Sequence, residues 1–360
     1  MLDRLGRSRV LTLSLALAAL LGLALPRATR AASVLDVQAV PYLDAAGRAA
    51  YARWLTVNLP RAVAIAPGGK IGWSGGTGGS VEEARAKVLE QCAATGATGC
   101  ALYAENLDVV WPSQRWAPPP VPGPLISTWN YAFVPDPRFI WWGPQSARGA
   151  YVWGHGYRGL ASDNRGAQPQ SHVRPFNNAG FDVIRFDREP MADDRNRAAG
   201  WLRDGLAELR RRGYRTIIAG DQSRGAWNAL QMLQTPGLAD AVVAVSPAAH
   251  GQGGSTNLLA QTDDLAALLA DVPTSRTRLA VVQFADDPFI GDPDRRAALF
   301  SRAAPRLGAL LLIDRPDGFS GHLAGGGLDF GQRYGECLLH FALDPAPPAA
   351  CPGTGAAARR

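Results

Sequence analysis

The chain has 360 residues, of which 47% are hydrophobic, so it is long enough to bury a large core. Its formal net charge is +6, but residues 1–31 hold five arginines and one aspartate. Without that segment, 32 of the 37 basic and 30 of the 31 acidic residues remain, a net charge of +2. A net charge this close to zero gives no reason to expect nucleic acid as a partner.

The first 31 residues have the pattern of a secretory signal peptide. Arg4, Arg7 and Arg9 precede an apolar stretch over residues 10–25, and a possible cleavage site ends at Ala31. The apolar stretch has 16 residues, fewer than the roughly 20 that cross a bilayer, so an uncleaved anchor is the second choice. We therefore predict a periplasmic or secreted protein with no stable membrane span after cleavage.

Residues 34–112 predict a small α+β domain. The expected elements are a helix over 43–55, strands over 62–66 and 70–73, a helix over 80–94 and a strand over 101–111. Ser80 and Glu83 form a capping box at the start of the second helix. This pattern, with Cys92 on the helix and Cys100 before the last strand, resembles a small secreted domain of unknown function and implies no activity.

The chain has four cysteines, an even number that predicts two disulfides in an exported protein. Three pairings are possible, and we favour Cys92–Cys100 and Cys337–Cys351 because each pair is close in sequence. The spacing does not suit a metal site, and no histidine neighbours the first pair. We therefore expect no metal.

A proline-rich linker over 113–124 leads to a second predicted domain over 125–343, followed by a tail over 344–360. This domain opens with a possible hairpin of 125–134 and 138–142. Strands are then expected over 150–153, 182–186, 216–219, 241–245, 279–284 and 309–313. Helices are expected over 194–212, 225–233, 257–269, 293–307 and 330–341. Alternating strands and helices predict a mostly parallel sheet with helices on both faces.

The most informative segment is 215–230, where an apolar run ends in Asp221-Gln222-Ser223-Arg224-Gly225 and a helix-forming stretch begins at once. This is the pattern of a nucleophile elbow, a sharp strand-to-helix turn that exposes a serine. Asp221 stands where the usual pattern has glycine. The alternative is an ordinary strand–turn–helix with Ser223 near the helix N-cap.

A nucleophilic serine needs a base, and the base needs an acid that orients it. Of the five histidines, only His322 lies in the loop between the last expected strand and the last expected helix, and His250 is an outside candidate in a glycine- and serine-rich loop. Asp286 and Asp287 end the strand over 279–284, and we prefer Asp287 as the acid. The alternative is that both aspartates only terminate the strand or cap a turn.

Acyl transfer also needs two backbone N–H groups that stabilise the oxyanion. We expect one from Arg224, directly after the serine, and the other from Tyr157 in a glycine-rich loop. His155 in the same loop is expected to shape the turn. The loops over 161–171 and 247–256 are expected to line the pocket.

Together these features resemble the α/β-hydrolase superfamily over residues 125–343. The matching segments are His155-Gly156, the approach at 179–187, the Ser223 elbow, Asp287-Pro288-Phe289 and Gly321-His322. The resemblance implies the α/β-hydrolase fold, a triad of Ser223, Asp287 and His322, a small-molecule or acyl-ester substrate and no cofactor. A non-catalytic cell-envelope binding protein on the same scaffold and an acyltransferase are the alternatives.

Overall fold

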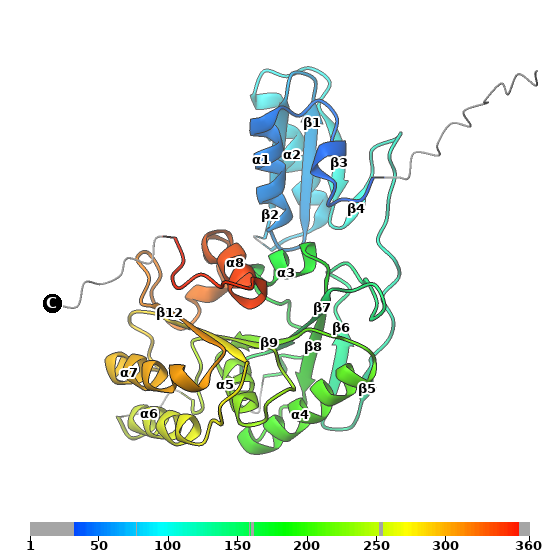
Figure 1. Cartoon of the computed structure of the whole chain (residues 1–360). Coiled ribbons are helices and arrows are strands. Elements are labelled where there is room, and N and C mark those ends of the chain that lie inside the picture. The colour runs from blue at the N-terminus through cyan, green and yellow to red at the C-terminus, as the bar shows by residue number, and fades with distance from the viewer. Residues whose placement is uncertain (1–31, 77, 158, 160–161, 252–254, 353–360) are drawn as a thin grey trace, which may run out of the picture. The chain divides into compact units, whose positions relative to one another are not determined.

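The computed structural model describes residues 32–352 except 77, 158, 160–161 and 252–254 (Figure 1). The predicted signal peptide at 1–31 therefore lies outside the described residues. Among the described residues, no helix is both long and apolar enough to cross a membrane. All of them belong to one compact unit, so the boundaries drawn at 34–112, 113–124 and 125–343 stay predictions.

The N-terminal part of the chain forms an antiparallel sheet in the order β2-β1-β3-β4. Its strands are β1 (Arg61–Ala66), β2 (Lys70–Gly75), β3 (Ala101–Glu105) and β4 (Asp108–Val109). Its helices are η1 (Val37–Ala39), α1 (Ala45–Leu55) and α2 (Val81–Ala94). The predicted capping box is present, because the Ser80 hydroxyl accepts from Glu83 N and the Glu83 carboxylate accepts from Ser80 N.

The single strand predicted over 101–111 is wrong, because the chain turns back between β3 and β4. Asn106 adopts a φ of 49° at this turn, a conformation that asparagine tolerates better than most residues. Its side-chain oxygen also accepts a hydrogen bond from Arg61 N at 3.2 Å, which ties the turn to β1.

Both predicted disulfides are confirmed. Cys92 and Cys100 have Cα atoms 6.0 Å apart, and Cys337 and Cys351 have Cα atoms 5.7 Å apart. Both separations lie within the usual range of about 4.4–6.8 Å. The first bridge joins the end of α2 to the segment before β3, and the second fixes the chain that follows the last helix.

The larger sheet has the order β12-β11-β10-β9-β7-β8-β6-β5. The strands are β5 (Ile126–Ser127), β6 (Tyr131–Pro135), β7 (Gly149–Gly154), β8 (Phe181–Arg188), β9 (Ile217–Gln222), β10 (Ala241–Val245), β11 (Arg278–Gln283) and β12 (Ala309–Asp314). Strands β7 to β12 are parallel, and β6 and β5 add an antiparallel edge.

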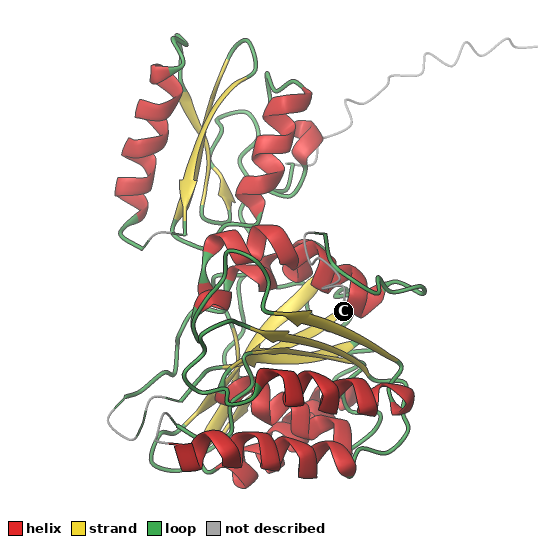
Figure 2. Cartoon of the chain, turned by 90° about the vertical axis from the view of Figure 1, so that its left-hand side faces the viewer, coloured by secondary structure: helices red, strands yellow, loops and turns green. Residues whose placement is uncertain are grey.

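Helices cover both faces of this sheet (Figure 2). The helices are α3 (Arg174–Asn178), α4 (Arg195–Arg211), α5 (Arg224–Gln231), α6 (Ser255–Ala270), α7 (Pro293–Ala303) and α8 (Leu328–Leu343). Alternate residues of β7 enter two separate cores: Ala150 and Val152 pack with α4 to α7, whereas Tyr151 and Trp153 pack with α3 and α8. The predicted α/β-hydrolase fold, with a small N-terminal α+β domain, is confirmed.

The predicted leading hairpin is wrong in its second strand. β5 and β6 both fall within 126–135, and residues 138–142 form no strand. The Ile140 N–H donates to the Asn177 side-chain oxygen at 2.9 Å, and the Trp142 N–H donates to Asp182 Oδ1 at 2.6 Å. Side chains from α3 and β8 thus take the place of a neighbouring strand.

Candidate active site

Ser223 stands at a sharp turn between the central strand β9 and helix α5. Its φ of 59° and ψ of −121° lie in a region that a residue with a side chain seldom adopts. The strain is held by the surroundings, since Ser223 N donates to Val245 O of β10 at 3.0 Å. The segment therefore has the backbone geometry of a nucleophile elbow.

Asp221 does not prevent this turn. Its backbone continues β9, with Gly154 of β7 and Ala244 of β10 as its register partners. Gly154 lies close to the elbow, since a Cβ added there would lie 3.4 Å from Gly225 Cα. Small residues therefore flank the elbow even though Asp221 replaces the usual glycine; the Asp221 side chain lies outside what the structure describes.

His322 and Asp287 form a buried pair. Nδ1 of His322 lies 2.9 and 3.0 Å from the two carboxylate oxygens of Asp287, and the residues are 9% and 7% exposed. Phe289 covers the imidazole, with ring centroids 4.2 Å apart. Asp286 instead accepts a hydrogen bond from Ser320 Oγ at 2.8 Å. Of the two adjacent aspartates, Asp287 is the one that contacts His322.

Ser223 and His322 line the same cavity, which has a volume of about 830 Å³. Nε2 of His322 is buried and has no hydrogen-bond partner in the described part of the chain. That ring nitrogen is therefore free to accept a proton. Besides its two histidines, the described lining contains no residue that ionises near neutral pH; its larger side chains include Trp153, Tyr157, Phe289, Leu323, Gln168, Gln170 and Gln222.

The glycine-rich loop after β7 passes close to the serine. A Cβ added at Gly156 would lie 3.6 Å from Ser223 Cβ, and the next residue, Tyr157, also lines the cavity. The Arg224 guanidinium carbon lies 5.1 Å from the centre of the Tyr157 ring. The two segments that carry the proposed N–H donors are thus neighbours, and the donor roles of Tyr157 and Arg224 stay a prediction.

His155, in the same loop, has both ring nitrogens engaged. Nδ1 lies 2.7 Å from Gly156 O and Nε2 accepts from Arg188 N at 3.0 Å, which fits a neutral ring protonated on Nδ1. Burial, followed by the charge of Arg188, lowers the pKa of His155 to about 3. His155 therefore shapes the loop, as the sequence suggested.

The structure does not bring His250 to the serine. Its Nε2 lies 2.7 Å from Asp264 and 3.0 Å from Arg195, away from the cavity lining. The described part of the loop over 247–256 supplies no lining residue, and residues 252–254 of that loop lie outside the described residues, whereas 161–171 supplies several lining residues. Within the described ranges, no group of three or more His, Cys, Asp or Glu could hold a metal ion.

Sequence reasoning missed the amide side chains around the pair. Gln222 Nε2 donates to the carbonyl oxygen of His322, and its Oε1 accepts from Gln170 Nε2 at 3.1 Å. Gln170 Oε1 in turn accepts from Trp153 Nε1 at 2.6 Å. The position of Gln222, directly before Ser223, was a usable signal, whereas nothing in the local pattern marks Gln170.

No protein-family model and no curated protein matches the chain. Among solved structures, it is similar to the esterase Pf2001 of Pyrococcus furiosus, at 14% identity and a TM-score of 0.43, over 59% of this chain and 87% of that one. It is also similar to Est1E of Butyrivibrio proteoclasticus, at 12% identity and a TM-score of 0.42, over 61% and 98%. A puromycin hydrolase matches at 16% identity and a TM-score of 0.39, over 64% and 40%. The strand order and the elbow define the α/β-hydrolase fold of this chain.

Proposed function

We propose that this chain is a serine hydrolase that cleaves carboxylic esters, with Ser223 as nucleophile, His322 as base and Asp287 as orienting acid. One observation carries the proposal. His322, which is buried, paired with Asp287 through Nδ1 and without a described partner at Nε2, lines the same cavity as a serine held in a strained strand-to-helix turn.

In the proposed mechanism, His322 Nε2 takes the proton of the Ser223 hydroxyl as its oxygen attacks the ester carbonyl. Asp287 holds the Nδ1–H and stabilises the imidazolium that forms. Backbone N–H groups of Tyr157 and Arg224 stabilise the oxyanion. The imidazolium then protonates the departing alkoxide, and a water activated by the same histidine hydrolyses the acyl-enzyme.

The cavity favours an uncharged acyl group. Trp153, Phe289 and Leu323 give it apolar walls, and its described lining offers no counter-ion for a carboxylate or an ammonium group. Burying an unpaired charge there would be costly. We therefore propose neutral esters as substrates.

Export is a separate part of the proposal. Two disulfides are typical of proteins that mature in an oxidising compartment, and the sequence of residues 1–31 predicts a signal peptide. Both observations support a periplasmic or secreted enzyme.

Hydrolysis of neutral p-nitrophenyl esters tests the activity. Ser223→Ala should lose roughly 10⁴–10⁶-fold in turnover while it stays folded. The matched control is Ser301→Ala on α7, where an exposed hydroxyl donates to Ala297 O at 2.9 Å, and this variant should match the parent. Parental turnover in Ser223→Ala would contradict the assignment. A parent inert towards all esters and towards serine-directed probes would favour the non-catalytic binding protein, and products formed with an added alcohol would favour acyl transfer.

A further inference from the structure

One wall of the cavity is formed by an irregular segment between β7 and α3. Asn164, Ala167, Gln168 and Gln170 of this segment line the cavity, and residues 167–170 have no regular secondary structure. Such a segment has no hydrogen-bonded ladder of its own. Its position therefore depends on the groups that bond to it from outside.

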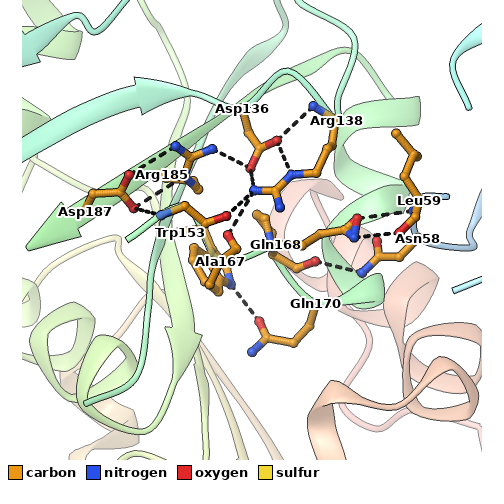
Figure 3. Close-up of polar contacts among 12 residues, drawn as sticks. Asn58, Leu59, Asp136, Arg138, Trp153, Ala167, Gln168, Gln170, Arg185 and Asp187 are labelled. Atoms are coloured by element: carbon orange, nitrogen blue, oxygen red, sulfur yellow. Dashed lines mark hydrogen bonds and ion pairs between the residues drawn. The ribbon is translucent and has the colours of Figure 1, made fainter. Parts of the chain in front are cut away.

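The chain that follows β6 holds the segment, with support from β8 (Figure 3). Arg138 Nη2 donates to the carbonyl oxygens of Gly166 and Ala167, each at 3.0 Å. Asp136 is buried, and its carboxylate accepts hydrogen bonds from Arg138 Nε at 2.8 Å and from Arg185 Nη1 at 3.0 Å. The Arg138 guanidinium, which donates to the segment, is thus itself held in place by a buried carboxylate.

Residues of the small N-terminal domain also hold this segment (Figure 3). Leu59 N donates to Gln168 Oε1 at 3.2 Å, and Gln168 Nε2 donates to Leu59 O at 2.8 Å. The Gln168 carboxamide therefore bonds to both backbone polar groups of Leu59. Asn58 Nδ2 donates to Pro169 O at 2.8 Å, and Asn58 Oδ1 accepts from Arg174 Nε at 3.0 Å.

The turn that makes these contacts is itself held in place. The buried guanidinium of Arg61, on the first strand of the small domain, donates to Leu55 O at 2.8 Å and to Val57 O at 3.1 Å. Arg61 is 1% exposed. Residues 58 and 59 therefore present fixed partners to the cavity wall.

A chain of amides continues from this wall to the proposed base. Gln170 lies two residues after Gln168, and its carboxamide bonds to Gln222, which donates to the His322 carbonyl oxygen. Leu59 of the small domain is thus connected to the backbone of His322 by hydrogen bonds to Gln168, by the backbone from Gln168 to Gln170, and by the hydrogen bonds of Gln170 and Gln222.

We propose that the small domain is a built-in part of the active site: Asn58 and Leu59 position the cavity wall 167–170, and through Gln170 and Gln222 that wall positions His322. Asn58, Gln168 and Gln170 are positioning residues. The inference rests on the proposed function for its kinetic consequences. The structural part of the inference is independent of the proposed function: residues more than a hundred positions earlier in the chain order the segment 167–170.

The test uses Asn58→Asp in the full-length mature chain. The aspartate keeps an acceptor for Arg174 and so retains that contact, but it loses the donor to Pro169 O and faces that carbonyl with a negative charge. We expect KM for a neutral ester to rise about tenfold with a smaller fall in kcat, because misplaced groups lose binding and orientation together. Amide hydrogen exchange of 166–170 should become faster.

The matched control is Asn178→Ala. Asn178 Nδ2 donates to Leu55 O at 3.1 Å, so it also links the small domain to the larger one, but it does not bond to the cavity wall. This variant should leave KM and the exchange of 166–170 within about twofold of the parent.

The outcomes separate the two proposals. Faster exchange of 166–170 in Asn58→Asp and not in Asn178→Ala supports the positioning role, even for a parent that hydrolyses no ester. Unchanged exchange in Asn58→Asp, or equal changes in both variants, overturns the inference and leaves the proposed hydrolase untouched. Gln170→Ala is the second variant: it should lower kcat more than it raises KM, and an unchanged kcat would overturn the link to His322.

Discussion

Two loops at the same edge of the sheet each place a histidine in the cavity, and they differ in what they leave free. The loop after β7 commits both ring nitrogens of His155 to backbone groups. The loop after β12 commits only Nδ1 of His322, to Asp287, and leaves Nε2 without a partner among the described residues. A histidine in a cavity is therefore a candidate base only when one ring nitrogen remains available.

The largest expected effect on activity comes from replacing His322, with the replacement of His155 as the comparison. His322→Gln should lose roughly 10⁴-fold in kcat/KM, because no other free base lines the described cavity. His155→Gln should retain far more activity, since its ring takes no part in proton transfer. Steady-state kinetics on a neutral ester decide this. Equal losses of kcat/KM in both variants would contradict the claim that only His322 acts as the base.

The second comparison separates the adjacent aspartates. Asp287→Asn should cost about 10⁴-fold in kcat, because the amide cannot hold the imidazole in the required tautomer or stabilise its charged form. Asp286→Asn should cost less than about tenfold, because Asp286 bonds to Ser320 and not to His322. A larger effect at Asp286 would transfer the role of acid to it.

The third prediction distinguishes stability from positioning. Replacing Cys337 and Cys351 by serine should lower the free energy of unfolding by about 2–4 kcal/mol, since the bridge closes a loop in the unfolded chain. Neither loop of the active site contains these residues, so kcat at 25 °C should remain near the parental value. Urea unfolding and kinetics on one preparation test this. A loss of kcat without a loss of stability would mean that the bridge acts on the His322 loop.

The smallest expected effect is the pH dependence of stability that His155 introduces. Burial lowers the pKa of His155 from 6.5 to about 3, so between these values the unfolded chain binds a proton that the folded chain does not. The free energy of unfolding should therefore fall as pH falls through this window, by up to about 1.4 kcal/mol per pH unit for this group. His155→Gln should reduce that slope. Urea unfolding at pH 7 and pH 5 measures it, and identical slopes would mean that His155 is protonated in the fold.

Local signals and chain order account for the expectations that match the observed geometry, whereas the catalytic roles of Ser223, His322 and Asp287 stay predictions. The Ser223 elbow was readable because strand, turn and helix are consecutive in the sequence. His322 and Asp287 followed from their places after particular strands, and the disulfides from the short spacing within each pair. Each of these inferences needed only one segment or the order of segments.

The wrong strand over 138–142 and the missed contacts of Gln168 have another cause, which is side chains that satisfy backbone groups far away in the sequence. Residues 138–142 looked like a strand, but the amide of Ile140 is taken by Asn177. The link between Leu59 and Gln168 has the same character, because a glutamine in a loop has no periodicity that reveals its partner. Such contacts exist only once the fold has brought the segments together.

The most direct test of the central claim is covalent labelling of the mature protein by a fluorophosphonate, followed by peptide mapping. We predict that a single site reacts, Ser223, and that Ser223→Ala and His322→Gln abolish labelling while His155→Gln retains it. Failure of the folded parent to react, or reaction at another serine, would contradict the account.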